Sequence, residues 1–185
     1  QLLMVCVEPK SMGLVLEWVD GPSLHNLLHV QKIRLTGERK LAILKDVLAG
    51  LAFMHHVRHT HLDVKSDNVL LCGEQGVAKL SDFGTTKEQR MTVMDIDTIA
   101  LTVSHSAPEI LSIPRKVSTA ADVWSVGMLI YEMETNSIPF AGLSFLQAAK
   151  AIDAGPLPTL SGDAPLRALF SQCVIVAPSK RASAK

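Results

Sequence analysis

Residues 61–84 read HLDVKSDNVLLCGEQGVAKLSDFG, and this stretch decides the fold. Two short apolar runs, Val69–Cys72 and Val77–Leu80, flank the turn-forming loop GEQG, which predicts an antiparallel β-hairpin. Asn68 precedes the first run and Asp82 follows the second, so antiparallel pairing brings these two residues together. An amide oxygen and a carboxylate at one end of a hairpin are suited to share Mg²⁺.

Two further residues in this stretch carry chemistry. Asp63 offers a carboxylate that could accept a hydroxyl proton, and Lys65 could neutralise a phosphate. Such groups beside a metal suit phosphoryl transfer, in which positioning and charge neutralisation supply most of the catalysis. Taken singly, an Asp or Asn at a strand end is more often a turn-former, and a lone lysine is more often solvated.

The segment HLDVKSDN resembles the catalytic loop H-R-D-L-K-x-x-N of eukaryotic-type protein kinases, with Leu62 in place of Arg and Val64 in place of Leu. Four more motifs of that family follow in its order: SDFG (81–84), APE (107–109), DVWSVG (122–127) and PSKR (178–181). The resemblance covers nearly the whole chain. It implies a protein-kinase-like α+β fold, here mainly the α-helical C-terminal lobe, with a small β-hairpin at the catalytic cleft and remnants of the N-terminal-lobe sheet.

The resemblance also implies one partial protein kinase domain over residues 1–185. Residues 1–19 would be the last N-lobe strands and the hinge, and residues 20–185 the C-lobe. The sequence contains no G-x-G-x-x-G loop and no V-A-I-K lysine, and it starts with Gln rather than Met, which suggests a fragment. Because those absent parts fix the nucleotide phosphates in the family, we expect poor turnover by this chain alone.

The family's catalytic roles transfer to residues that match its motifs. Asp63 would be the catalytic base, Lys65 would stabilise the transferred phosphoryl group, and Thr102 would contact both. Asn68 and Asp82 would hold Mg²⁺.

ATP would lie at the hinge. Main-chain groups of Glu17, Trp18 and Val19 would bind adenine, with Leu16 in front of them as the gatekeeper. The alternative for Trp18 and Val19 is plain strand packing. The remaining nucleotide contacts expected from the resemblance are Ser23 at the ribose and Leu70 as the floor under adenine, together with the metal-binding residues Asn68 and Asp82.

Two structural roles also follow from the resemblance. Asp122 would anchor the backbone of the catalytic loop, and Glu109 and Arg181 would form a buried ion pair.

The function implied is ATP-dependent phosphorylation of a protein hydroxyl. Lys65, two positions after Asp63, resembles the serine/threonine-specific pattern. A different class stays open: a non-catalytic, pseudokinase-like interaction module. Apolar residues around Leu2, Val5, Leu14 and Leu16 would then be exposed at the N-lobe edge and available to a partner.

Composition narrows the class of protein. The chain has 185 residues, of which 48% are hydrophobic, and its 18 Lys+Arg balance 18 Asp+Glu. This argues against a disordered chain and removes the basic excess that nucleic-acid or anionic-membrane binding needs. No apolar run approaches the roughly 18 residues of a membrane span. Three scattered cysteines favour a reducing compartment, and we expect a cytoplasmic protein.

Apolar periodicity predicts the remaining elements. Strands are expected in Leu2–Val7 and Gly13–Val19, and a long loop over 85–106. The expected helices are a short one capped by Ser23 and ending at His29, one from Gly37 with Leu41, Leu44, Val47, Leu48, Leu51 and Met54 on its buried face, a fully buried one over Asp122–Glu134, and two more over Phe145–Ala154 and Ala164–Val174.

A zinc site is conceivable at the histidine-rich segment HHVRHTH, because His55 and His59 are four apart on one helix face. No second ligand cluster lies nearby in the sequence. The alternative, drawn from the resemblance, is that His61 packs beside Phe83. Phe83 and Leu70 are themselves expected in the core.

Overall fold

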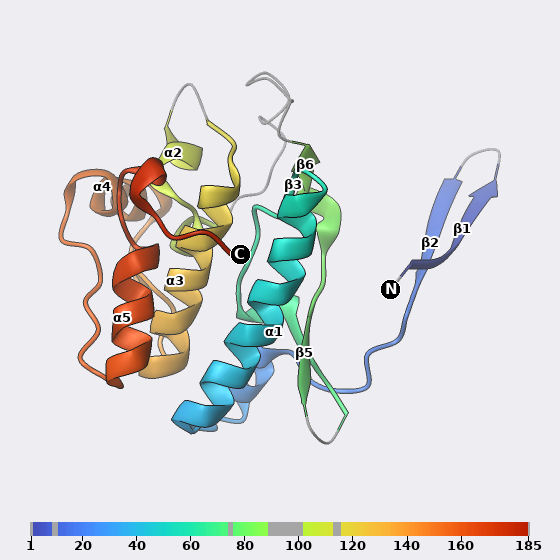
Figure 1. Cartoon of the computed structure of the whole chain (residues 1–185), viewed down its shortest axis with the longest axis horizontal. Helices are drawn as coiled ribbons and strands as arrows, with labels where there is room; N and C mark the ends of the chain where they lie inside the picture. Colours follow the sequence, from blue (N-terminus) through green and yellow to red (C-terminus); the bar gives the residue numbers. More distant parts are fainter. Residues whose placement is uncertain (1, 9–10, 74–75, 89–101, 113–115, 185) are drawn as a thin grey trace.

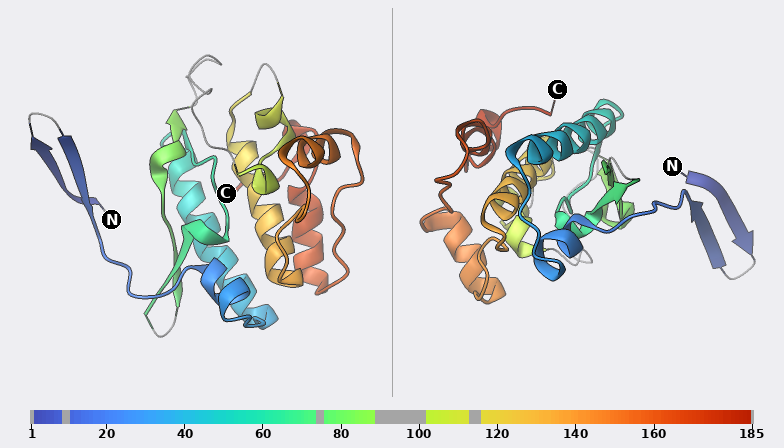
Figure 2. Two further views of the ribbon diagram at one scale, coloured as in Figure 1. Left: turned by 180° about the vertical axis from the view of Figure 1, so that it is seen from behind. Right: turned by 90° about the horizontal axis from the view of Figure 1, so that it is seen from below.

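The computed structural model describes residues 2–8, 11–73, 76–88, 102–112 and 116–184. This part of the chain is a body of helices bordered by two small sheets, β3–β6 and β4–β5. A third two-stranded sheet, β1–β2, stands apart from that body in both views (Figures 1 and 2). The architecture is the mainly helical α+β arrangement that the motifs imply.

Helix α3 (Thr119–Thr135) is the centre of the body, and it begins three residues before the predicted start. It is buried on nearly every face, with Trp124, Met128 and Leu129 fully enclosed, as its continuous apolar sequence predicts. Helix α5 (Ala164–Cys173) lies alongside it. Gly127 permits this close approach, because a Cβ there would lie 2.5 Å from Cγ2 of Val174.

Helix α1 (Gly37–His56) covers another side of α3. Its first turn is capped by Thr36, whose hydroxyl oxygen accepts the main-chain N–H of Arg39 at 3.3 Å. Leu41 is 38% exposed, contrary to the prediction, and Ile43 is buried instead. Because an α-helix turns by about 100° per residue, Leu41 lies outside the buried face that Val47 and its buried neighbours form.

The hairpin at the centre of the sequence forms as predicted. Strands β4 (Val69–Cys72) and β5 (Val77–Leu80) are antiparallel, with Val69 opposite Leu80. Strands β1 (Leu2–Glu8) and β2 (Ser11–Leu16) also pair, but β2 ends three residues before the expected Val19. Trp18 is 85% exposed, which excludes plain strand packing for its side chain.

In its described parts, residues 85–88 and 102–106, the segment expected as a long loop forms a short strand and a 3₁₀ turn. Strand β6 (Lys87–Glu88) pairs with β3 (His59–Thr60), and one 3₁₀ turn, η5, spans Val103–His105. Both are too short to produce a sequence period. Residues 89–101 lie outside the described residues.

The remaining helical elements surround this core. They are the π-type helix η1 (Asn26–Val30), α2 (Pro108–Leu111), α4 (Phe145–Ala154), and the 3₁₀ turns η2 (Ser66–Asn68), η3 (Phe83–Thr85) and η6 (Pro178–Lys180). Ser23 precedes η1 and its hydroxyl oxygen accepts the N–H of Asn26 at 3.1 Å, close to the predicted cap. Within the described ranges, none of the helices has the length and apolar character needed to cross a bilayer.

A buried ion pair connects α2 with the end of the chain. The guanidinium of Arg181 donates from Nη1 and Nη2 to the two carboxylate oxygens of Glu109, at 2.6 and 2.7 Å. The same side chain donates to the carbonyl oxygens of Ala120, Ile175 and Val176 and lies over the Trp124 ring. The predicted pair is confirmed, and it joins segments 72 positions apart.

Substituting Arg181 should therefore destabilise the fold. Arg181→Ala leaves the Glu109 carboxylate buried without its partner, which typically costs about 3–5 kcal/mol. Urea denaturation of both proteins measures the loss, with Arg167→Ala, an exposed arginine on α5, as the control that should stay within about 0.5 kcal/mol. A loss below about 1 kcal/mol for Arg181→Ala would contradict a buried pair.

Candidate active site

The segment 61–68 is fixed to α3 by one buried carboxylate. Asp122 accepts the main-chain N–H groups of His61 at 2.9 Å and Leu62 at 2.8 Å, and Nε2 of His55 lies 2.8 Å from its Oδ2. Leu62 has a φ of 68°, a left-handed conformation that costs a non-glycine residue energy. The two hydrogen bonds hold the backbone in this shape, as expected for an anchor of the catalytic loop.

Asp63 is the centre of a connected polar network. Its Oδ1 accepts the hydroxyl proton of Thr102 at 2.9 Å, and its Oδ2 lies 2.9 Å from Nζ of Lys65. Nζ of Lys65 also donates to the Thr102 hydroxyl at 2.6 Å, and the Asn68 amide donates to Asp63 Oδ2 at 2.8 Å. Asp63 and three other residues singled out in the sequence thus form one network, although Thr102 lies 39 positions from Asp63.

Asn68 and Asp82 flank the open end of the β4–β5 hairpin. The carbonyl oxygen of Asn68 accepts the N–H of Ser81 at 2.9 Å, which closes the ladder. Asp82 is exposed and left-handed, with a φ of 59°, and its carboxylate accepts the N–H of Gly84. The Asn68 amide nitrogen is directed to Asp63, and the amide oxygen is the atom that would bind a metal. A magnesium ion shared by Asn68 and Asp82 stays a prediction.

Phe83 is 51% exposed rather than a core residue. It follows the left-handed Asp82, and one side of its ring meets His61, with centroids 5.3 Å apart, as predicted. The rest of the side chain lines the neighbouring cavity.

A cavity of about 510 Å³ lies between the hinge segment and the hairpin. Its lining includes five residues predicted to contact the nucleotide: Leu16, Glu17, Val19, Leu70 and Asp82. Lys79 also lines it, and Nζ of Lys79 lies 2.5 Å from Oε1 of Glu17. The hydrogen bond between them lowers the pKa of Glu17 and raises the pKa of Lys79, so the pair is charged at neutral pH. The cavity therefore offers apolar walls with a few charged groups at its edge, as ligand sites commonly do.

The side chains of two other residues predicted to contact the nucleotide, Ser23 and Trp18, have other contacts or orientations. Ser23 forms a β-bridge with Leu70, and its hydroxyl oxygen accepts the N–H of Asn26. The hydroxyl proton can still be donated to a ligand. The side chain of Trp18 is turned to solvent, which leaves only its main chain for the expected adenine contact.

The histidine segment that could have held zinc is occupied by other contacts. His55 bonds Asp122, the Nε2 of His61 lies 3.1 Å from the carbonyl oxygen of Ser81, and His59 contacts the carbonyl of Val57. Among the described residues, the only group with metal-binding geometry lies elsewhere. The zinc hypothesis for this segment is therefore wrong.

Glu132 is a buried polar residue near the site that was not predicted from the sequence. This residue is 1% exposed on α3, and it accepts the hydroxyl proton of Ser66, inside the catalytic segment, at 2.5 Å. Burial opposes its ionisation, but hydrogen bonds with His105, Ser66 and His29 outweigh that cost and lower the pKa of Glu132. A carboxylate within the apolar run Ile130–Met133 was the available signal, since a buried acid needs partners.

Comparison of the sequence with known proteins agrees with the kinase motifs identified in it. A family model described as "Protein kinase domain" covers residues 1–185. Proteins named serine/threonine-protein kinase cst-1, from Caenorhabditis elegans and Caenorhabditis briggsae, are each 29% identical to this chain over 179 residues. The alignment covers 95% of this chain and 36% of each relative, so the chain spans about a third of their length.

The Asp122 anchor generates a testable expectation. Asp122→Ala leaves two main-chain N–H groups buried without acceptors, at about 1–3 kcal/mol each, so the free energy of unfolding should fall by at least about 2 kcal/mol. Chemical denaturation measures it, and Asp153→Ala, an exposed acid on α4, should change it by less than about 0.5 kcal/mol. Equal stability of the two variants would show that the anchor contributes little.

Proposed function

Because this chain belongs to the protein kinase family, we propose that it supplies the catalytic lobe of a serine/threonine kinase, which transfers the ATP γ-phosphoryl group to a protein hydroxyl. The observation that carries the proposal is the network of Asp63, Lys65, Thr102 and Asn68. Each side chain has a hydrogen-bonded or ion-paired partner within it, so the four groups are held in one geometry. A chain without a catalytic role has no physical need for this arrangement.

Asp63 is the base that orients the substrate hydroxyl in this proposal. Its carboxylate is buried, and Thr102 and Asn68 fix its rotamer, so the acceptor oxygen is positioned before the substrate arrives. Lys65 lies beside it as a positive charge that can neutralise the phosphoryl oxygens during transfer. The hydrogen bond that Lys65 donates to the Thr102 hydroxyl keeps that charge near the carboxylate.

The protein kinase family generally uses ATP and Mg²⁺, and the residues around the cavity fit both. Leu16, Val19 and Leu70 give apolar walls for a base, and the hinge resemblance assigns the adenine contacts to the main chain of Glu17 to Val19 beside them. The exposed carboxylate of Asp82 and the amide oxygen of Asn68 are hard donors of the kind Mg²⁺ prefers. We assign ATP to this cavity, Ser23 to the ribose side, and Mg²⁺ to Asn68 and Asp82.

The proposal divides the chain at the hinge. Residues 1–19 correspond to the last N-lobe strands and the hinge, and residues 20–185 to the C-lobe. No Gly-rich loop or V-A-I-K lysine occurs within these 185 residues, so we expect that they cannot cover the phosphates unaided.

A second candidate function has one observation in its favour. The β1–β2 hairpin presents exposed apolar side chains, among them Leu3, Val5, Val7 and Leu16. A surface of this kind suits a protein partner. The side chains of Leu2 and Leu14, expected to join it, lie outside the described residues.

Phosphoryl transfer from radiolabelled ATP to a generic basic protein tests the function. The 185-residue chain alone should transfer slowly, and the chain preceded by a protein kinase N-lobe should transfer at a measurable rate. In the extended protein, Asp63→Asn should lower kcat by about 10²–10⁴-fold, because the base is lost while its size is kept. Asp153→Asn, on α4, should leave kcat unchanged.

Three outcomes would count against the proposal. Full activity of Asp63→Asn would remove the assigned base. An inactive extended protein that still folds would favour the interaction module. Transfer by the short chain at the rate of the extended one would show that the phosphate-covering loop is dispensable.

A further inference from the structure

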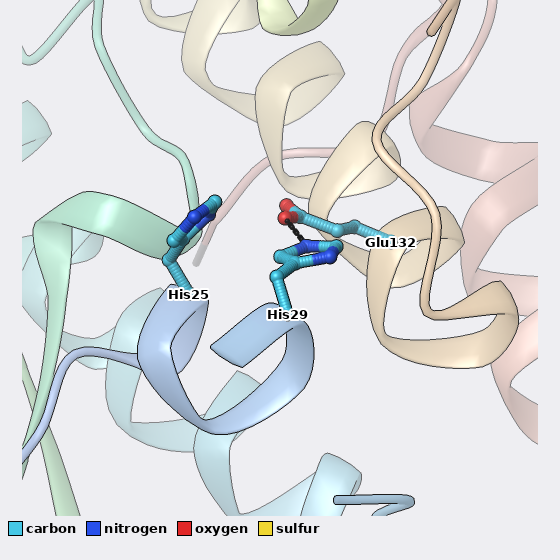
Figure 3. A group of neighbouring side chains, drawn as sticks. All are labelled: His25, His29 and Glu132. Carbon is cyan, nitrogen blue, oxygen red and sulfur yellow. Dashed lines mark hydrogen bonds and ion pairs between the residues drawn. The ribbon is translucent and has the colours of Figure 1, made fainter. Parts of the chain in front are cut away.

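A group of three metal-binding side chains lies outside the proposed ATP cavity. His25 and His29 are one helical turn apart at η1, and Glu132 reaches them from α3 (Figure 3). One ligand atom from each residue lies within 4.8 Å of the others. We propose that His25, His29 and Glu132 form a binding site for a zinc-class divalent cation.

His25 has a ring nitrogen that makes no hydrogen bond among the described residues. This Nδ1 atom is shielded from solvent. The Asp67 carboxylate lies 3.6 Å from it, beyond hydrogen-bond distance. A shielded ring nitrogen without a partner normally costs free energy, and a metal ion would satisfy it.

Glu132 supplies the negative charge. Its Oε1 lies 2.6 Å from Nε2 of His29, and its Oε2 lies 3.1 Å from Nε2 of His105. Every partner of this buried carboxylate in the described part of the chain is a histidine or a serine, so it has no permanently charged cation beside it. A buried anion needs compensation, which either protonated histidine or a divalent ion can provide.

The kinds of ligand atom at this site favour zinc over magnesium. Two imidazole nitrogens and one carboxylate oxygen match the three-ligand zinc sites that keep a fourth position open for water. Mg²⁺ instead prefers oxygen donors and retains its waters, so it should not compete. His105, which contacts the other carboxylate oxygen of Glu132, is near enough to act as an outer partner that orients this ligand.

The position of the site connects it with the catalytic segment. Ser66 donates to Glu132, and Asp67 lies beside His25, so residues of the catalytic loop contact two of the three proposed ligands. A bound ion would therefore join η1, the catalytic loop and α3. Zinc binding itself does not depend on the proposed kinase function.

Zinc titration of the metal-stripped chain, followed by calorimetry, tests the site. We expect one Zn²⁺ per chain, bound at least about tenfold more weakly by His25→Ala and by His29→Ala. His56→Ala, which removes an exposed histidine at the end of α1, is the matched control and should bind like the unchanged chain. Excess Mg²⁺ should not displace the zinc.

Co²⁺ provides a second readout that does not rely on affinity. Bound at this site, it should give the visible absorption of a low-coordinate ion with nitrogen ligands, and His25→Ala should remove that band. This variant breaks no hydrogen bond that the structure shows to Nδ1, so it should stay folded, which circular dichroism can verify. The proposal is overturned if the chain takes up no Zn²⁺, if His25→Ala binds it unchanged, or if His56→Ala weakens binding as much.

Discussion

Two buried carboxylates on α3 hold the proposed catalytic loop, residues 61–68, at two points. Asp122 accepts the main-chain N–H groups of His61 and Leu62, and Glu132 accepts the hydroxyl proton of Ser66. The two acids are ten positions apart on the helix (132 − 122), a rise of about 15 Å. The loop is therefore attached to a fully packed helix at two separate points, and Asp63 and Lys65 lie between them.

This constraint explains why the polar network is well defined. Asp63 and Lys65 have little freedom to move along the loop, so one hydroxyl, that of Thr102, is enough to connect them. Arg181 acts at the N-terminal end of α3, close to Asp122, where its bonds to Glu109 and to the carbonyl of Ala120 fix the segment that follows Thr102. Charged groups buried against α3 thus position the site, while apolar packing through Trp124 and its neighbours makes α3 rigid.

Local sequence patterns predicted much of this arrangement. The β4–β5 hairpin, the central helix and the Glu109–Arg181 pair follow from short-range periodicity and from motif order. The partners of Glu132 and the cluster at His25 could not be found in this way, because they depend on which side chains distant segments bring together. His29 and Glu132 are 103 positions apart. The exposure of Phe83 was missed because an aromatic residue beside a strand reads as core, whereas the left-handed turn at Asp82 leads it to the cavity wall.

The left-handed backbone of Leu62 has a consequence for the order of folding. An isolated loop would not adopt that conformation, since its cost of about 1–3 kcal/mol is offset only when Asp122 accepts the two N–H groups. Asp122 lies 60 positions further along the chain, so the loop cannot take its final shape until a long segment has closed and α3 has docked. We expect the hairpin and the helices to form early and the catalytic loop to be completed late, at the step that also assembles Asp63, Lys65 and Thr102.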